Sequence, residues 1–515
     1  MTVRRLALAL ALLAAVVATL AAAPAPNGPK LADYYTLIPP KVIDPDFSPL
    51  FLDVTPFSAD LNGDGNEDLV VLGVDYSCCA PPNDPQPSRV FFGDGDGNFT
   101  APAPGQFPFD TFKMVDPRKV VFGDLNGDGR LDMFIACHGW DTDPYPGEQN
   151  RLYLSEPGGG WRDATSTLPQ LSDYTHSAAA GDLSGRGVLD IIAGNYFGAQ
   201  NNISSYALLN DGAGHFTMTR ANIPAGPGQA MDAQTGHWFV ATTLADLDGN
   251  GLPELILGSS GSDPVPYSKL THSTILWNEY GAFRDGNKTE LPFPSPFFEF
   301  HHDLDVEPID FDGDGWPDLV IVGTQGSSTV FYDGWFVQLL RNQGNGSFVD
   351  VTARYLDPSD AFGGTPGVPT EAPPIYWVKV LDFNGDGLPD FSVEYTPFGG
   401  GWSDPNLGIW GPHLPPSQPL IYINSGRGHF STLKVGDFVA PGYEQALGGG
   451  HLMRTRNGYS FITPYGQPSA DGPLPGLRLT GLLATKPYRQ PAVPRRMPVA
   501  PRPESPLPAN PKPRG

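Results

Sequence analysis

The sequence is poor in cysteine, in basic side chains and in long apolar runs, and each shortage argues against one class of protein or partner. Three cysteines in 515 residues exclude a disulfide framework, although one bridge from Cys78 or Cys79 to Cys137 is as compatible with this count as three free thiols. There are 31 Lys and Arg against 56 Asp and Glu, and the resulting net charge of −25 argues against nucleic acid as a partner. After the N-terminal residues, no apolar run is long enough to span a bilayer.

The first 25 residues have the three parts of a secretory signal peptide. Arg4 and Arg5 are basic, the stretch from Leu6 to Leu20 is apolar, and small residues follow where a signal peptidase would cleave. We therefore expect a secreted or extracytoplasmic protein that has no transmembrane helix once the signal is removed. An uncleaved N-terminal anchor is the alternative.

The sequence is rich in glycine and in a short acidic motif that recurs along the chain. Each copy precedes a strand-like apolar run and, further on, a hairpin with a Gly-rich turn. A seventh hairpin, "HLMRTRNGYSF" at 451–461, follows a stretch around Asp437 in which the acidic motif is degenerate. The repeats therefore predict seven units of four short strands, an arrangement typical of a β-propeller, whose ring closure protects the sheet edges. The motif reads "DLNGDGNED" from Asp60, "DLNGDGRLD" from Asp124, "DLSGRGVLD" from Asp182, "DLDGNGLPE" from Asp246, "DFDGDGWPD" from Asp310 and "DFNGDGLPD" from Asp382.

This pattern resembles the FG-GAP/VCBS repeats of integrin α-chain propellers and of secreted bacterial propellers. The resemblance implies an all-β fold, a seven-bladed β-propeller with calcium-binding loops between strands 1 and 2 of most blades. We expect a signal peptide at 1–25, a linker at 26–45, the propeller at 46–465 and a disordered, Pro-rich basic tail at 466–515.

The acidic motif carries the residue types that calcium binding needs. Calcium takes six to eight oxygen ligands, and positions 1, 3, 5 and 9 of each loop supply them from side chains, while glycine at position 6 allows the tight turn. The alternative is a set of ordinary Asp/Asn/Gly turns without metal. The expected ligands are Asp60, Asn62, Asp64 and Asp68 in blade 1; Asp124, Asn126, Asp128 and Asp132 in blade 2; Asp246, Asp248, Asn250 and Glu254 in blade 4; Asp310, Asp312, Asp314 and Asp318 in blade 5; and Asp382, Asn384, Asp386 and Asp390 in blade 6.

The loops differ in the number of acidic ligands. Blade 5 has four carboxylates and is predicted to bind calcium most tightly, whereas blade 4 is predicted to bind it more weakly. In blade 3 Arg186 stands at position 5, and we expect its guanidinium to pair with Asp182 and Asp190 in place of an ion.

Unusual residues gather before strand 1 and after strand 2 of several blades, at the end opposite the calcium loops. They include Asp116, Arg118 and the pair Tyr376–Trp377. A concave face with aromatic and polar side chains around a channel is where a ligand would bind. The alternative is that these segments pack on one another with their histidines bonded to backbone. The expected ligand-face residues are His138, Trp140, Asp141, His176, Asn195, Tyr196, His237, Trp238, His301, His302 and Asp303.

The sequence thus predicts a ligand-binding or adhesion module for a glycan or an extracellular protein, with calcium as its cofactor. An extracellular polysaccharide lyase or hydrolase on the same scaffold is the alternative, with His176, His237 or His302 acting beside Asp303 or Asp141. No GxSxG, HExxH or phosphate-binding motif occurs, so we expect binding rather than catalysis.

Overall fold

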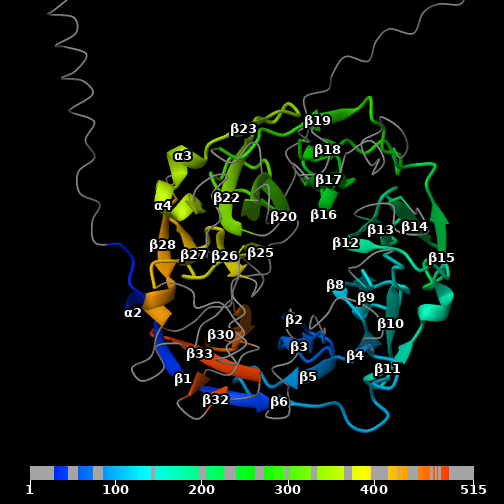
Figure 1. Ribbon diagram of the computed structural model, residues 1–515, viewed down its shortest axis with the longest axis horizontal. Coiled ribbons are helices and arrows are strands. Elements are labelled where there is room, and N and C mark those ends of the chain that lie inside the picture. Colours follow the sequence, from blue (N-terminus) through cyan, green and yellow to red (C-terminus); the bar gives the residue numbers. More distant parts are fainter. Residues whose placement is uncertain are drawn as a thin grey trace, which may run out of the picture.

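In the part of the chain that the computed structural model describes, seven antiparallel sheets stand around a central channel as the blades of a propeller (Figure 1). This confirms the predicted all-β, seven-bladed fold. The described residues are 28–44, 56–73, 85–140, 145–195, 204–224, 239–260, 272–295, 301–325, 333–364, 374–395, 416–426, 429–438, 450–463, 468–469, 472–473 and 477–486.

Blades 1 to 6 each run outward from the channel in chain order. Their strands are β2 (Pro56–Ala59), β3 (Asp68–Val71), β5 (Arg89–Gly93) and β6 (Phe99–Thr100) in blade 1; β8 (Pro117–Gly123), β9 (Asp132–Cys137), β10 (Arg151–Glu156) and β11 (Gly160–Asp163) in blade 2; β12 (Thr175–Gly181), β13 (Asp190–Asn195), β14 (Tyr206–Asn210) and β15 (Phe216–Thr219) in blade 3; β16 (Phe239–Ala245), β17 (Glu254–Ser259), β18 (Thr274–Leu276) and β19 (Lys288–Glu290) in blade 4; β20 (His301–Ile309), β21 (Asp318–Gln325), β22 (Asp333–Asn342) and β23 (Phe348–Asp350), with β24 (Phe362–Gly363) beside β22, in blade 5; and β25 (Ile375–Leu381), β26 (Asp390–Tyr395), β27 (Pro419–Asn424) and β28 (Phe430–Lys434) in blade 6.

Short elements connect or flank the blades. They are α2 (Leu31–Tyr34), η1 (Thr165–Thr167), α3 (Thr352–Tyr355), α4 (Pro358–Ala361) and η3 (Val435–Phe438), with the two-residue pairs β4 (Gln86–Pro87) with β7 (Lys113–Met114) and β31 (Pro468–Ser469) with β32 (Gly472–Pro473).

In blades 1 to 5 the second strand is mostly a continuous apolar run because it is buried on both faces. β3 and β9 are buried at every position, from the loop aspartate through to Val71 and Cys137 respectively. Such a strand has no solvent-facing side, so alternation of apolar and polar residues would place polar groups in the interior. The core is accordingly a ring of apolar clusters between neighbouring blades, such as Leu69 and Val71 of blade 1 against Met453 and Ile462 of blade 7.

Asparagines join neighbouring blades through the loops. In four blades the asparagine at the end of the third strand, or just after it, donates its Nδ2 hydrogen to the carbonyl at position 2 of the preceding blade's loop, which satisfies a buried backbone acceptor. The pairs are Asn210 with Leu125 (2.7 Å), Asn278 with Leu183 (2.9 Å), Asn342 with Leu247 (3.0 Å) and Asn424 with Phe311 (2.8 Å). In blade 7 the hydroxyl of Tyr35 donates to the equivalent carbonyl, that of Phe383.

Blade 7 joins the two ends of the described chain. Its order from the channel outward is β29 (His451–Thr455), β30 (Gly458–Thr463), β33 (Leu477–Ala484) and β1 (Tyr35–Asp44). In Figure 1 the blue β1 lies beside the red β33. The outermost strand of the last blade is therefore the first strand of the chain.

This closure differs from the organisation expected from the sequence. The hairpin at 451–461, expected as the outer half of the blade, forms its two inner strands, because Arg456 and Asn457 join β29 to β30 without any acidic loop. The expected linker at 26–45 contains β1, and the expected tail at 466–515 contains β33. The sheet of blade 7 thus extends past both ends of the range 46–465.

The expected signal peptide lies outside the described residues, as do Cys78, Cys79 and residues 487–515. Cys137 is fully buried at the end of β9 and forms no disulfide with any residue in the described part of the chain. In the described part of the chain, no helix is both long and apolar enough to cross a membrane.

Candidate functional site

The inner strand of each of blades 2 to 6 has a β-bulge near its N-terminal end. The pairing of each inner strand with its neighbour skips one residue, the one six positions before the first loop aspartate. A bulge re-aims the side chain of the extra residue, and such bulges are common next to binding and active sites. The bulged residues are Arg118, His176, Val240, Leu304 and Tyr376.

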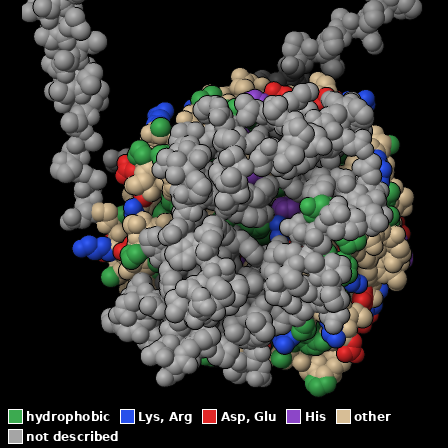
Figure 2. All heavy atoms as spheres, in the orientation of Figure 1, with side chains coloured by type: hydrophobic (Ala, Val, Ile, Leu, Met, Phe, Trp, Pro, Cys, Tyr) green, Lys and Arg blue, Asp and Glu red, His purple; other side chains and the backbone are tan. Residues whose placement is uncertain are grey.

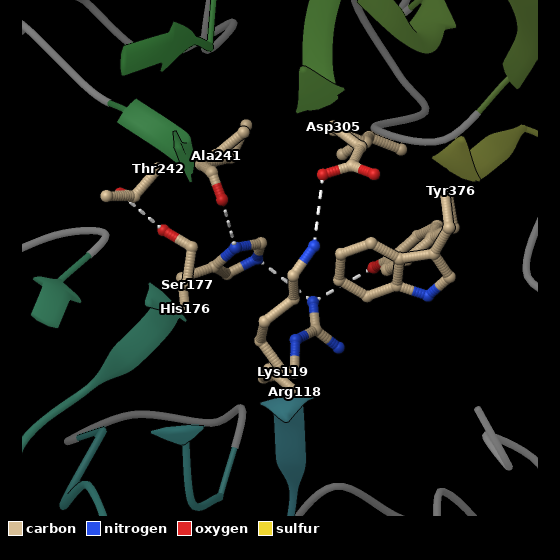
Figure 3. A pocket seen from close by; sticks show the side chains of 11 residues that line it. Arg118, Lys119, His176, Ser177, Ala241, Thr242, Asp305 and Tyr376 are labelled. Carbon is tan, nitrogen blue, oxygen red and sulfur yellow. Dashed lines mark hydrogen bonds and ion pairs between the residues drawn. The ribbon is translucent and has the colours of Figure 1, made fainter. Parts of the chain in front are cut away.

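These five residues and those that follow them line a cavity in the channel. The cavity is small, because the space that a water-sized sphere can occupy is about 10 Å³, close to what one water molecule needs. Figure 3 shows Arg118 and Lys119 of β8 reaching toward side chains from the other blades, and Figure 2 shows His and basic side chains at the bottom of a hollow in this face. The residues that follow the bulged positions are Lys119, Ser177, Ala241, Asp305 and Trp377, and Thr242 completes the lining.

Arg118 is the centre of the hydrogen bonds in this layer. Its Nη2 lies 3.0 Å from Nε2 of His176 and 2.9 Å from the hydroxyl oxygen of Tyr376, so one guanidinium joins blades 2, 3 and 6. Nδ1 of His176 lies 2.9 Å from the carbonyl oxygen of Val240. A carbonyl only accepts and a guanidinium only donates, so His176 carries its proton on Nδ1 and is neutral. Burial, with Arg118 and His138 nearby, holds the pKa of His176 well below its ordinary value.

Lys119 forms the second link across the channel. Its Nζ lies 3.1 Å from Oδ1 of Asp305 in blade 5 and 4.0 Å from the ring centre of Trp377 in blade 6. The other oxygen of Asp305 accepts a hydrogen bond of 3.1 Å from the backbone of Val378. The cavity therefore presents two cations, a carboxylate and two aromatic rings within one layer.

His138 lies directly behind this layer. Its Nδ1 is 3.2 Å from Oδ2 of Asp116, and its ring packs at 3.5 Å on Tyr174 and at 5.5 Å on His176, between ring centres. Asp116 is also 3.8 Å from Arg118. The structure thus brings together two of the predicted histidines, His138 and His176, with Asp116 and Arg118 from the same sequence junctions.

The predicted group at the start of β20 makes different contacts. Nδ1 of His302 lies 2.6 Å from the hydroxyl oxygen of Ser260, and Nε2 of His301 lies 3.2 Å from that of Ser259. Asp303 accepts a hydrogen bond from the hydroxyl of Ser273. These serines belong to or flank the strands of blade 4, and all three β20 side chains are buried. Burial lowers the pKa of His302 to about 3 and raises that of Asp303 to about 7.

The remaining predicted ligand-face residues are divided between buried contacts and positions that the structure does not describe. Asn195 is buried in blade 3, where its side chain lies 3.4 Å from Asp173, and Trp140 is half-buried after β9. Asp141, Tyr196, His237 and Trp238 lie outside the described residues.

Sequence reasoning missed Lys119 and Asp305 as site residues. A signal for them exists, since both stand five positions before the first aspartate of a loop, next to the bulged position. Aligning the inner strands on the loop motif, rather than looking for unusual residue types, would have placed them in the same layer.

The loops are folded around their first aspartate. In blade 5 Oδ1 of Asp310 accepts hydrogen bonds from the backbone N–H groups of Gly313 and Asp314, and Oδ2 accepts one from Gly315. Gly315, at position 6, has a φ of 89°, a conformation that favours glycine. Backbone amides thus hold the carboxylate at the centre of the loop.

The carboxylate at position 9 is fully buried in each of the five loops with an intact motif. Burial raises the pKa values of Asp68 to about 7, Asp132 to about 6, and Glu254, Asp318 and Asp390 to about 8. Each of these carboxylates accepts a hydrogen bond from the backbone N–H at position 2 of its loop, and a nearby cation would stabilise its ionised form further.

The loop residues fit a hard cation such as calcium. In blade 4 the carboxylate oxygens of Asp246, Asp248 and Glu254 come within 4.8 Å of one another, and Oε1 of Glu254 is buried without a hydrogen-bond partner. Carboxylate oxygens gathered in this way are the ligands that calcium prefers.

Blade 3 differs as its sequence predicts. Nη2 of Arg186 lies 2.8 Å from Oδ1 of Asp190. The expected second pairing, with Asp182, involves the backbone of Arg186 rather than the guanidinium, because the arginine N–H donates to Asp182 at 2.9 Å. The guanidinium instead reaches Ser184 and the carbonyl of Asn210.

A further polar cluster joins blades 6, 7 and 1. Nε2 of His451 lies 2.9 Å from the hydroxyl of Ser58, and Nδ1 lies 2.6 Å from Glu394. Ser58 donates to Glu67 at 2.8 Å, and Lys379 lies 3.5 Å from the same carboxylate. With the serine proton directed to Glu67, this cluster links the blades on either side of the ring closure.

Comparison with known families agrees with this architecture. The family model for FG-GAP-like repeats matches residues 60–135 and 310–393, which contain the loops of blades 1, 2, 5 and 6. No curated protein sequence matches the chain.

Similar solved structures are distant in sequence. A structure on recognition of non-reducing terminal N-acetylglucosamine by an Agrocybe aegerita lectin is 17% identical, with a TM-score of 0.42, over 77% of this chain and 84% of that one. A family 43 β-1,3-galactosidase is 9% identical, with a TM-score of 0.33, over 57% of this chain and 92% of that one. The Photorhabdus luminescens Tc holotoxin pore is 16% identical, with a TM-score of 0.32, over 80% of this chain and 17% of that one.

Proposed function

We propose, from the premise that this chain is a seven-bladed β-propeller of FG-GAP-like repeats, that it is a secreted, calcium-stabilised module that binds a ligand at the mouth of its central channel. One observation carries the proposal. Five inner strands bulge at the same position, and the side chains at and after the bulges converge on one cavity. A propeller does not need a buried arginine in its channel for stability, since burying a charge is costly.

The residues of the cavity favour a glycan as the ligand. Arg118 and Lys119 offer N–H donors, Asp305 offers an acceptor, and Tyr376 and Trp377 offer aromatic rings. Small-molecule sites combine a few placed polar groups with aromatic surface, and a sugar at this channel mouth would replace contacts that Arg118 and Lys119 now make with other blades. A protein ligand that inserts an acidic side chain would use the same donors.

Calcium is proposed for the loops of blades 1, 2, 4, 5 and 6. When bound, it would compensate the buried carboxylates and pin each loop between strands 1 and 2. The carboxylates of Asp310, Asp312 and Asp314 also lie within 4.8 Å of one another. The first 25 residues resemble a signal for export. Outside the cell the calcium concentration is high enough to fill loops of modest affinity.

Catalysis is the weaker candidate on the geometry. The histidine–carboxylate pair nearest the cavity is His138 with Asp116, at 3.2 Å. Neither residue lines the cavity, and His176, which does, is fixed between Arg118 and the carbonyl of Val240. A general base must reach the proton that it removes. The arrangement therefore supports binding.

A glycan array probed with the whole protein tests this proposal. We expect binding of a defined set of glycans, lost in Arg118→Gln and retained in Arg220→Gln, which changes an exposed arginine of blade 3. Arg118→Gln should keep the calcium-dependent melting of the wild type. Equal glycan binding by both variants would contradict a binding site in the channel. Turnover of a bound glycan would establish the enzyme alternative.

A further inference from the structure

Arg341, near the end of β22, contacts two aspartates of the blade 5 loop. Its Nε lies 2.5 Å from Oδ2 of Asp312, and its Nη2 lies 2.8 Å from Oδ2 of Asp314. The other oxygen of each carboxylate accepts a backbone hydrogen bond, from the N–H groups of Asp314 and Trp316 respectively. The oxygens that the backbone leaves for a cation are therefore the two that face the guanidinium.

In blades 1 and 6 the free oxygen of the aspartate at position 5 accepts a hydrogen bond from an asparagine instead of an arginine. Nδ2 of Asn62 donates to Oδ2 of Asp64 at 3.3 Å, and Nδ2 of Asn384 donates to Oδ2 of Asp386 at 3.0 Å. In these two blades the asparagine at position 3 thus satisfies the free oxygen of the aspartate at position 5, whereas in blade 2 that oxygen of Asp128 is contacted by Arg130, at position 7 of the loop. Blade 5 has an aspartate at position 3, which cannot donate, and two adjacent carboxylates repel each other.

In the sequence, the blade that has aspartates at positions 3 and 5 is also the blade that has the arginine. Among the six loops, only that of blade 5 has acidic residues at both positions 3 and 5. Only blade 5 also has a basic residue at the corresponding position in or just after its third strand. The residues at that position in blades 1, 2, 3, 4 and 6 are Phe92, Leu154, Leu209, Trp277 and Ile423.

We infer that Arg341 is a built-in counter-cation that competes with calcium for the blade 5 loop. This inference rests on the proposed calcium binding. In calcium-free protein Arg341 compensates Asp312 and Asp314, and an incoming ion has to displace the guanidinium from their oxygens. Charge-assisted, two-pronged contacts of this kind are among the stronger side-chain interactions. Counting carboxylates alone ranks blade 5 as the tightest site, but the cost of displacing Arg341 places its affinity below that expected for four acidic ligands.

Terbium luminescence can observe this loop separately from the others. Tb³⁺ accepts the same oxygen ligands as calcium and emits when a neighbouring indole is excited, and Trp316 is at position 7 of this loop. The part of the emission that is lost in Trp316→Phe reports blade 5. We expect Arg341→Gln to raise the affinity of that component about tenfold. The matched control Arg220→Gln should leave it unchanged.

Melting in chelator supplies a second readout that needs no metal. Arg341→Gln should lower the melting temperature in chelator, because Asp312 and Asp314 lose their counter-cation, and calcium should narrow the gap to wild type. Equal terbium affinities together with equal melting in chelator would overturn the role of Arg341 alone. If neither protein binds terbium or calcium and chelator leaves the wild type unchanged, the proposed calcium binding fails, and this inference fails with it.

Discussion

Nζ of Lys119 and Oδ1 of Asp305 lie 3.1 Å apart, although their blades are separated by two others on one side of the ring and three on the other. With Arg118, which bonds to Tyr376 of blade 6, the pair ties non-neighbouring blades together through the channel. At this layer the channel is thus filled by the protein's own polar side chains. A ligand would bind by exchanging partners with these groups, so replacing them should affect recognition before it affects the fold.

Removing calcium should destabilise the whole propeller. An ion that binds only the folded state, at a concentration a hundredfold above its Kd, adds about 2.7 kcal/mol to the free energy of unfolding. We expect chelator to lower the melting temperature by several degrees in a calorimetric scan, and excess calcium to restore it. Identical melting curves in chelator and in calcium would rule out calcium in the loops.

The loop of blade 3 should bind no ion. Arg186 already pairs with the buried Asp190, at 2.8 Å. Asp182→Ala should therefore leave the bound calcium unchanged in metal analysis, while lowering stability because the backbone N–H of Arg186 loses its acceptor. Asp386→Ala in blade 6 should lose one equivalent. The same calcium loss from both variants would contradict this role of Arg186.

Asn424 should contribute to stability through the neighbouring blade. Its Nδ2 donates to the carbonyl of Phe311 in blade 5, and its backbone N–H donates to Asp390 of its own loop. Asn424→Ala leaves a buried carbonyl without a donor, so we expect a loss of about 1–3 kcal/mol in denaturant unfolding. Asn345→Ala, in an exposed hairpin, is the control and should cost far less. Equal losses would show that the contact between blades contributes nothing.

Asp303 should make the stability of the fold depend on pH. Burial raises its pKa from 3.8 to about 7. Between these values the folded state holds more protons than the unfolded state, so this group lowers stability as the pH rises, by up to about 1.4 kcal/mol per pH unit, and the loss is complete above pH 7. Asp303→Asn removes the effect, and its melting temperature should exceed that of wild type by more at pH 8 than at pH 5.

The exposed Asp110 provides a control for this comparison. Asp110→Asn should shift the melting temperature equally at the two pH values. If Asp303→Asn behaves in the same way, the carboxyl of Asp303 does not carry the raised pKa.

Truncation should locate the end of the folded chain. β33 lies between β1 and β30 in the sheet of blade 7. Removing residues 477–515 therefore takes away one strand and detaches another, and we expect loss of cooperative unfolding by circular dichroism. Removing only residues 487–515 should leave the melting temperature within about one degree, because β33 ends before them. Stable folding of the shorter chain would show that β33 is dispensable.

The sequence predicts the repeating parts of this fold well and the closing part poorly. The six loops beginning at residues from Asp60 to Asp382 each have a local motif, so the blades that they belong to could be identified one at a time. The pairing of Tyr35 with Ala484 has no local signal, because it depends on where the completed ring brings two distant strands. The same division applies to the site. His138 and His176 could be identified from their residue type alone, whereas the role of Lys119 and Asp305 depends on their contact across the channel, which has no local signal.

The pairing of the first strand with the last also sets the order of events during folding. β1 is synthesised first, but its partner β33 follows only after all other blades, and closing so long a loop is slow because its entropy cost precedes any gain from contacts. Until then both edges of β1 are unpaired, and Ile38 and Val42 are exposed even in the finished propeller. Ring closure should be the rate-limiting step of folding, and the open ring should be the species most prone to aggregate.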